Sequence, residues 1–215
     1  MKLLKCRLTT FEPMLGSAPA NPEIYKEFIA SKAPDAPGVE DEIAAIGADA
    51  VAEKGTTVFP RNADGEPILF DYHVKGMFKD ACQMLRYEKG DNESCKLKAY
   101  KKLIDGLIFP CPRQIPIRFD GNITICQRPL RAQTLQGERV ALASSEQIPA
   151  GAVIEFGVLC KNDGLVAAVR EWLDYGILRG LGQWRNSGMG RFTWEETSCE
   201  DVSPAEVSAL FRKAV

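Results

Sequence analysis

An alternating pattern in residues 2–11 places the strongest constraint on the fold. Successive side chains alternate between two sets along this stretch. One set is Leu4, Cys6, Leu8 and Thr10, and the other is Leu3, Lys5, Arg7 and Thr9. A period of two is typical of a β-strand with one face buried. The pattern therefore predicts that the chain enters a half-buried sheet at its very start.

Two longer segments have the periodicity of amphipathic helices. In residues 74–90, the hydrophobic side chains at helical spacing are Met77, Ala81, Met84 and Leu85. In residues 163–180, the corresponding stripe consists of Leu165, Val169, Trp172, Leu173, Gly176 and Ile177. Such stripes predict helices that bury one side against the rest of the fold. A short basic helix is also predicted over residues 95–107, with Lys98, Lys101 and Lys102 on one face.

Turn-forming residues punctuate the strand-like segments that remain. Asp64-Gly65 within residues 56–72 and Asp120-Gly121 within residues 115–132 are strong hairpin signals. A third strand pair is predicted around "IPAG", residues 148–151. A strand at residues 190–197 and a helix that Ser203 caps follow near the end of the sequence.

Acidic residues concentrate between residues 12 and 66, which contain 11 Asp and Glu residues but only 4 Lys and Arg residues. Two helices are predicted there, over residues 22–32 and 39–54, as an insertion at about 20–55. This insertion could dock a protein partner, support self-association, or mask a basic face until RNA arrives. It could equally consist of solubilising helices that cover a sheet edge.

The order of these elements predicts the fold class. Strand, helical insertion, hairpin, helix, several strands, helix and final strand indicate an α+β fold with a largely antiparallel sheet and helices on one face. We expect a single domain over residues 1–215, with a ferredoxin-like (RRM-like) core and a helical insertion after the first strand.

Composition limits the classes of function. A net charge of −2 argues against a bulk nucleic-acid binder, but residues 73–118 hold 10 Lys and Arg against 5 Asp and Glu and could form a basic face. The seven cysteines form no C-x-x-C pair, so we expect neither a metal site nor a cofactor. With no secretory signal and no long apolar run, the expected location is the cytoplasm.

A glycine-rich segment joins the second amphipathic helix to the last strand. It contains Gly180, Gly182, Trp184, Arg185, Asn186, Gly188, Gly190 and Arg191. It lacks the G-K-[ST] of a Walker loop, and it runs from helix to strand, opposite to a Rossmann fingerprint. A helix C-terminus does not attract phosphate, so Arg185 and Arg191 would supply the charge and Trp184 would stack on a base. The alternative is a glycine-rich turn with no ligand.

Three segments carry a resemblance to a known family. "GLGQWRNSGMGRF" resembles the C-terminal glycine-rich loop of the RAMP superfamily, the RNA-binding subunits of CRISPR effector complexes. Lys75, Gly76 and Lys79 resemble the family's K-G-x-x-[RK] motif at its first core helix, and Pro149, Ala150 and Gly151 resemble its turn before the last helix. The resemblance covers about half of the chain, whereas "FDYH" replaces the family's usual serine-rich run.

The resemblance implies a non-catalytic RNA-binding protein of the backbone-subunit type. In the family, the glycine-rich loop contacts RNA backbone. The RNA-binding residues implied here are Lys75, Gly76, Lys79, Gly180, Gly182, Trp184, Arg185, Asn186, Gly188, Gly190 and Arg191.

Two alternatives belong to other classes. Some RAMP endoribonucleases cut RNA without metal by means of a general acid, a general base and a lysine, for which His73, Tyr72 and Lys75 are the candidates. In strand geometry, however, Tyr72 and His73 would point to opposite faces. The second alternative is a phage or mobile-element interaction protein, or decoy, that keeps the fold without binding RNA.

Overall fold

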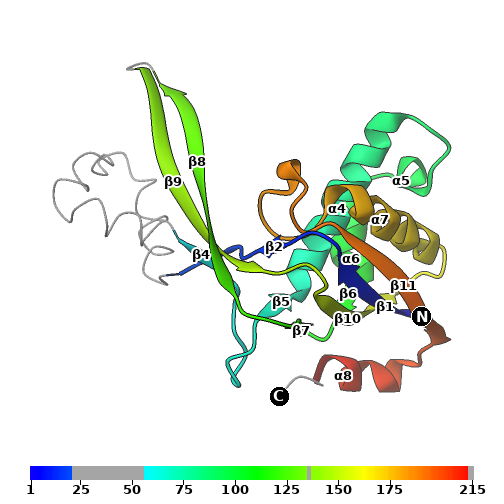
Figure 1. Ribbon diagram of the computed structural model, residues 1–215. Coiled ribbons are helices and arrows are strands. Elements are labelled where there is room, and N and C mark those ends of the chain that lie inside the picture. The colour runs from blue at the N-terminus through cyan, green and yellow to red at the C-terminus, as the bar shows by residue number, and fades with distance from the viewer. Residues whose placement is uncertain (21–55, 135–136, 213–215) are drawn as a thin grey trace, which may run out of the picture. The chain divides into compact units, whose positions relative to one another are not determined.

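A computed structural model describes residues 1–20, 56–134 and 137–212 (Figure 1). The chain divides into two compact units. The first unit contains Met1–Met14, Pro60–Asn122 and Ile148–Val215, and the second contains Leu15–Phe59 and Ile123–Gln147. The predicted acidic insertion at about 20–55 lies almost wholly outside the described residues. Its role and the assignment of residues 1–215 to a single domain therefore stay predictions.

The first unit is built on a six-stranded sheet with the order β11-β1-β10-β7-β5, in which β6 also pairs with β10. All of its pairings are antiparallel. Its strands are β1 (Lys2–Thr10), β5 (Ile68–Phe70), β6 (Ile108–Cys111), β7 (Gln114–Arg118), β10 (Val153–Cys160) and β11 (Phe192–Asp201). The predicted alternation of β1 is confirmed, because Leu4, Cys6, Leu8 and Thr10 are all buried.

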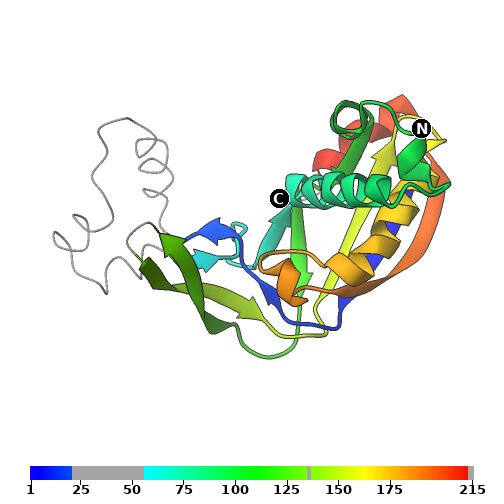
Figure 2. The same ribbon diagram turned by 90° about the horizontal axis from the view of Figure 1, so that it is seen from above.

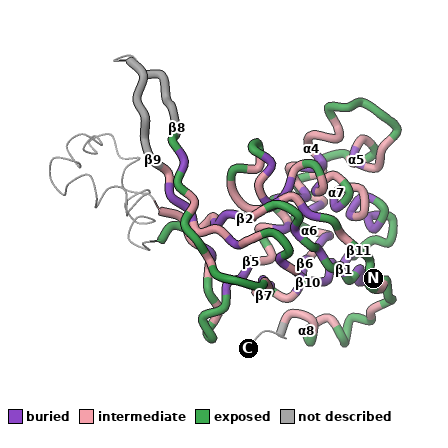
Figure 3. Tube along the Cα trace, in the orientation of Figure 1, coloured by how far each residue is buried: buried purple, intermediate pink, exposed green. Residues whose placement is uncertain are grey.

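Helices cover one face of this sheet, where α4 and α7 lie side by side (Figure 2). In the described part of the chain, the α-helices before the last strand are α4 (Asp71–Glu88), α5 (Glu93–Lys96), α6 (Tyr100–Leu107) and α7 (Leu165–Arg179). Phe78 of α4 and Trp172 of α7 are fully buried, with ring centroids 5.5 Å apart. Buried residues of β1, β10, α4 and α7 form the core between sheet and helices (Figure 3).

The last helix, α8 (Pro204–Arg212), packs on the other face of the sheet. Leu3 lies on this face, one residue from the core-facing Leu4, and forms an apolar cluster with Cys111 and Leu159 that α8 covers. The helix begins at Pro204, as predicted, but the bond at its start runs the other way: the Glu206 carboxylate accepts from the N–H of Ser203 at 2.8 Å and from its hydroxyl at 2.7 Å. The sheet thus has a fully covered face and a face that is covered only at one end.

The second unit contains a sheet with the order β2-β9-β4-β3, in which β8 pairs with β9. Its strands are β2 (Met14–Leu15), β3 (Ala18–Pro19), β4 (Thr57–Val58), β8 (Thr124–Thr134) and β9 (Gly137–Ile148). A polar group lies at its centre, where the Ser145 hydroxyl bonds both the Thr57 hydroxyl at 2.7 Å and the Arg128 guanidinium at 3.1 Å. A hydrogen-bonded polar centre of this kind ties β4, β8 and β9 together.

The predicted α+β class, with antiparallel sheets and helices, is confirmed. The predicted hairpin turn at Asp64-Gly65 is confirmed: an antiparallel bridge joins Arg61 and Pro67, and the N–H of Asn62 donates to the carbonyl of Glu66 at 3.0 Å. The other two predicted hairpins are wrong, because neither β7 with β8 nor β9 with β10 forms a pair. Each of these two pairs spans a point where the chain passes between the two units. The predicted basic helix is also divided, because Ala99 has left-handed backbone angles, so Lys98 precedes α6. None of the described helices is long and apolar enough to cross a membrane.

Candidate nucleic-acid interface

The glycine-rich loop lies in the first unit, between α7 and β11, and is held by main-chain hydrogen bonds. The N–H of Leu181 donates to the carbonyl of Gly190 at 2.9 Å, which closes the loop on itself. The N–H of Gly190 donates to the carbonyl of Pro13 at 2.8 Å, which fixes the loop to the end of β1. A single 3-10 turn, η1 (Arg185–Ser187), lies between these contacts. These main-chain hydrogen bonds define the conformation of the loop.

Two of its glycines are required by that conformation. Gly180 and Gly190 have φ angles of 73° and 70°, which L-residues with a side chain rarely adopt. A Cβ at Gly180 would lie 2.5 Å from the carbonyl oxygen of Met189, and one at Gly190 would overlap the carbonyl oxygen of Leu181. The close approach of the two loop strands explains these glycines, so they are not by themselves evidence for a ligand.

Two arginines of the region share one carboxylate. Asp80 of α4 accepts hydrogen bonds through Oδ2 from Arg179 Nε at 2.9 Å and from Arg185 Nη1 at 2.8 Å. Arg179 also donates to the side chain of Asn186 at 2.6 Å. The three charged side chains are 21–28% exposed. They form a partly buried cluster with more positive than negative charge, which we call the Asp80 cluster: Asp80, Arg179, Arg185 and Asn186.

Arg185 and Asn186 were predicted as site residues from the sequence, whereas Asp80 and Arg179 were not. Arg179 directly precedes Gly180, and Asp80 directly follows Lys79, so both adjoin residues that the family resemblance singled out. This adjacency is the sequence feature that points to Asp80 and Arg179. Sequence patterns do not predict their contact, because the two residues are 99 positions apart in the chain.

Trp184 and Arg191 are the remaining side chains of the loop that were expected to bind RNA. Trp184 is 41% exposed and has left-handed backbone angles, with φ at 53°. A residue with a side chain pays about 1–2 kcal/mol for this conformation. The Arg191 Nε donates to the carbonyl of Leu178 at 3.0 Å. The loop thus presents an indole ring from a strained position and a guanidinium anchored through one nitrogen.

Lys75 and Lys79 lie on α4, where their contacts are with α6 and β6. The Lys75 amine donates to the carbonyl of Asp105 at 3.2 Å and lies 4.5 Å from the ring centre of Phe109. The Lys79 amine lies 2.6 Å from the Asp105 carboxylate. Partial burial lowers the pKa of Lys75. The structure therefore brings the two lysines together at Asp105, whereas the next residue, Asp80, contacts the loop.

Tyr72 and His73 lie in the first turn of α4, which begins at Asp71, three residues before the predicted start of that helix. Their expected arrangement on opposite faces of a strand is wrong, because in the helix the two rings lie edge to face at 4.5 Å. The Nδ1 atom of His73 accepts a hydrogen bond from the N–H of Phe70 at 3.2 Å, so the imidazole caps the helix. Within the described residues, no group of acidic, Cys or His side chains is arranged to hold a metal.

The cap predicts a dependence of stability on pH. Burial lowers the pKa of His73, and protonation would remove the lone pair that accepts the Phe70 N–H. The stabilisation is then fully present above the unfolded-state pKa of about 6.5 and is lost as the pH falls through the folded-state value. We expect a loss of about half a kcal/mol between about pH 7.5 and pH 5.5, because the ring is partly exposed.

Urea unfolding of the wild type and of His73→Asn at both pH values checks this prediction. The asparagine oxygen can accept the same hydrogen bond but does not titrate in this range. His73 is the only histidine, so the variant should lose the pH dependence. An unchanged dependence in His73→Asn would show that another group causes it.

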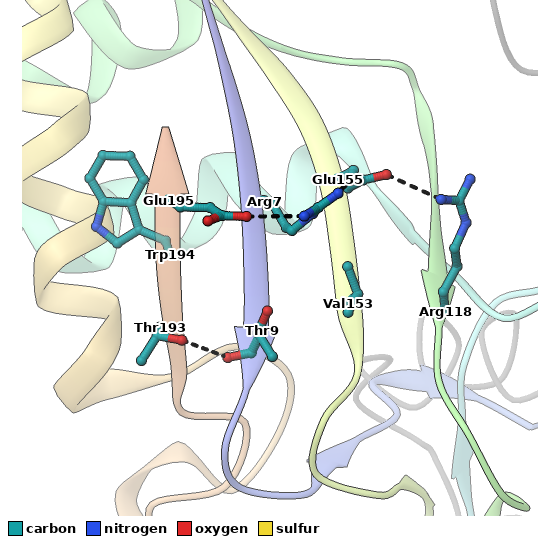
Figure 4. Close-up of a pocket in the computed structure, with 8 residues that line it drawn as sticks. All are labelled: Arg7, Thr9, Arg118, Val153, Glu155, Thr193, Trp194 and Glu195. Atoms are coloured by element: carbon teal, nitrogen blue, oxygen red, sulfur yellow. Dashed lines mark hydrogen bonds and ion pairs between the residues drawn. The ribbon is translucent and has the colours of Figure 1, made fainter. Parts of the chain in front are cut away.

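The uncovered part of the other sheet face forms a shallow hollow (Figure 4). Arg7 lies at its centre, 2.7 Å from Glu155 and 3.1 Å from Glu195, and Arg118 lies 3.1 Å from Glu155. The remaining lining residues are Thr9, Val153, Thr193 and Trp194. Two arginines are matched here by two carboxylates. This face therefore offers no excess positive charge for a phosphate backbone, in contrast to the Asp80 cluster.

Comparisons with known proteins give structural matches but no sequence match. No protein-family model and no curated protein matches the sequence. The fold is similar to one chain of a solved structure described as the cryo-EM structure of the Type III-B Cmr-beta bound to cognate target RNA, with a TM-score of 0.47 and 10% sequence identity. The match covers 93% of this chain and 60% of that chain, so this protein spans less than two thirds of its length.

Proposed function

We propose that this protein is a non-catalytic RNA-binding protein with a RAMP-type, ferredoxin-like core, which holds an RNA backbone at the glycine-rich loop. The order of elements in the first unit supports the fold assignment. The β-α-β-β-α-β order of ferredoxin-like folds is followed by β1, α4, the successive strands β6 and β7 (both of which pair with β10), β10, α7 and β11. The motifs that resemble the RAMP superfamily lie on α4, before β10 and between α7 and β11.

The Asp80 cluster is the observation that carries the proposal. Two guanidinium groups on one carboxylate leave a net positive charge, and Asp80 fixes their positions through the bonds of 2.9 Å and 2.8 Å. Each guanidinium has five N–H donors in a fork that fits phosphate, and only some of them are used within the protein. An RNA phosphate would add a second anion to a site that is already assembled.

Neighbouring residues favour RNA over an isolated small anion. Trp184 offers an exposed ring on which a base can stack, and Arg191 follows in the same loop. Lys101 and Lys102 at the start of α6 are exposed and add positive charge to the helical side of the unit. The combination of positive groups with an aromatic ring is typical of proteins that bind single-stranded nucleic acid.

Arg185→Ala combined with Arg191→Ala tests the proposal. Loss of two phosphate contacts should weaken binding of a labelled single-stranded RNA on the order of tenfold or more at physiological salt. It should also reduce the slope of log affinity against log salt by about 1.4, since each contact with a single strand contributes about 0.7. Fluorescence anisotropy over a salt series measures both quantities.

The matched control removes two arginines that lie outside the proposed site. Arg118 and Arg170 form exposed ion pairs with Glu155 and Glu196, and their replacement by alanine changes the net charge equally. This control should bind RNA almost as the wild type does. The proposal fails if the two double variants behave alike or if the wild type does not bind RNA. Cleavage of the RNA in EDTA that His73→Ala abolishes would contradict the non-catalytic assignment.

A further inference from the structure

We propose that the exposed side of α4 is a track for single-stranded RNA, on which an unpaired base stacks on Tyr72 and the backbone crosses the helix at Gly76. This inference rests on the proposed function and identifies a second contact surface for the same ligand. Tyr72, Gly76 and Asp80 follow one another at intervals of four residues, so they lie along one side of the helix. Helical rise separates the two ends of this track by about 12 Å.

Tyr72 has the properties of a pre-organised stacking platform. Its ring stacks on Phe70 with centroids 5.2 Å apart and an angle of 15° between the planes, and its edge meets His73. The Tyr72 N–H donates to Asp71 at 2.9 Å. Half of the side chain is still exposed, at 50%. A tyrosine held by two rings loses little freedom when a base stacks on it, so more of the stacking energy contributes to affinity.

A guanidinium group also lies beside the rings of Phe70, Tyr72 and His73. Arg113 lies over the Phe70 ring at 6.0 Å and pairs with Asp71 at 3.2 Å. Arg113, Phe70 and Tyr72 therefore form a layered arrangement at the start of α4. A base on Tyr72 would extend this stack by one layer, with a positive charge nearby for its phosphate.

Gly76 is the second observation, and no contact among the residues that the structure describes explains it. It lies inside α4, where glycine is less favourable than alanine, and it is exposed. A Cβ built at this position meets no atom within 4 Å, and its φ is not among the positive values. Neither packing nor backbone conformation requires a glycine here. A bare position lets a polynucleotide backbone approach the helix closely between Tyr72 and the Asp80 cluster.

The platform is tested with a single-stranded RNA that contains a fluorescent adenine analogue. Stacking on an aromatic side chain contributes about fivefold to a hundredfold in affinity per base. We expect Tyr72→Ala to lower the affinity by this factor and to reduce the quenching of the analogue, and Tyr72→Phe to retain both. The matched control is Tyr87→Ala, on the same helix and 69% exposed, which should bind as the wild type does.

The bare position is tested with Gly76→Ala and with Gly106→Ala. Gly106 lies in α6, and a Cβ there also meets no atom within 4 Å. Both variants should raise the melting temperature by about 2 °C, because alanine favours a helix. Only Gly76→Ala should weaken RNA binding, which separates a contact with the ligand from an effect on folding.

The outcomes distinguish this inference from the function on which it rests. If Tyr72→Ala and Gly76→Ala bind RNA as their controls do while Arg185→Ala with Arg191→Ala does not, the track is wrong and the loop still binds RNA. If the wild type does not bind RNA, both proposals fail. If Tyr72→Ala weakens binding without changing the quenching of the analogue, the ring contacts RNA without stacking, and the platform is overturned.

Discussion

Gly190→Ala is expected to destabilise the protein by about 3 kcal/mol, and its melting temperature should fall by roughly 6–12 °C. The left-handed conformation, with φ at 70°, accounts for about 1–2 kcal/mol. The overlap of the new Cβ with the Leu181 carbonyl adds about 1–3 kcal/mol, because a main-chain atom cannot rotate away. The loop can relieve that overlap only by lengthening the hydrogen bonds of Gly190 to Leu181 and Pro13.

Gly65→Ala provides the control for this prediction. Gly65 also has a positive φ, at 80°, but a Cβ there meets no atom within 4 Å. It should cost only the conformational part, about 1–2 kcal/mol. Thermal unfolding of the three proteins separates the two contributions. Equal melting temperatures for Gly190→Ala and Gly65→Ala would show that the loop does not close on itself as described.

The contrast between Gly190 and Gly76 shows that glycines of two motifs with the same expected role can have different structural causes. Gly190 and Gly180 are required by the close approach of two main-chain segments. Gly76 has open space around it and no unusual φ. The sequence alone assigned all of them to RNA contact, because spacing cannot separate a steric need within the protein from a need at a ligand. Alanine substitution does separate them, with opposite signs of the stability change.

Local periodicity predicted most of the individual elements of the first unit. The alternation of β1 and the stripe of α7 follow from burial of one face, which depends only on nearby residues. Pairing between strands depends on distant residues, and two of the three predicted pairings are wrong. Asp120-Gly121 and "IPAG" do mark changes of direction, with positive φ at Gly121 and Gly151, but the strands beside each turn pair elsewhere. A turn residue determines where the chain changes direction, but it does not determine with which strand the neighbouring strands pair.

The candidate site was predicted to a similar extent. The loop residues Arg185 and Asn186 both belong to the Asp80 cluster. Arg185 donates to Asp80, and Asn186 accepts a hydrogen bond from Arg179. Lys75 and Lys79 instead pack towards Asp105, one helical face away. Helical geometry decides this difference, because adjacent residues of a helix diverge by about 100°. The motif points to the helix that carries Asp80, and the structure shows which side of that helix contacts the loop.

Asp80→Asn is the second variant with a large expected effect. It removes the charge that two partly buried guanidinium groups share, at 2.9 Å and 2.8 Å. Hydrogen bonds to charged groups contribute about 1.5–3 kcal/mol, so we expect a loss of about 2 kcal/mol in the free energy of unfolding. Glu196→Gln is the control, because its single partner Arg170 lies in a more exposed pair and should cost less than about 1 kcal/mol.

The response of Asp80→Asn to anions tests the site more directly than its stability does. Without the carboxylate, Arg179 and Arg185 face each other with no counter-charge between them, and an oxyanion can occupy that position. Inorganic sulfate or RNA bound at that position stabilises the folded state of Asp80→Asn, because the unfolded chain lacks the site. Either anion should therefore raise the melting temperature of Asp80→Asn more than that of the wild type. Glu196→Gln should respond as the wild type does, because general salt effects act on both alike. If sulfate raises the melting temperatures of Asp80→Asn and Glu196→Gln equally, Arg179 and Arg185 do not form an anion site. The proposal that the loop binds an RNA phosphate backbone then loses its principal support.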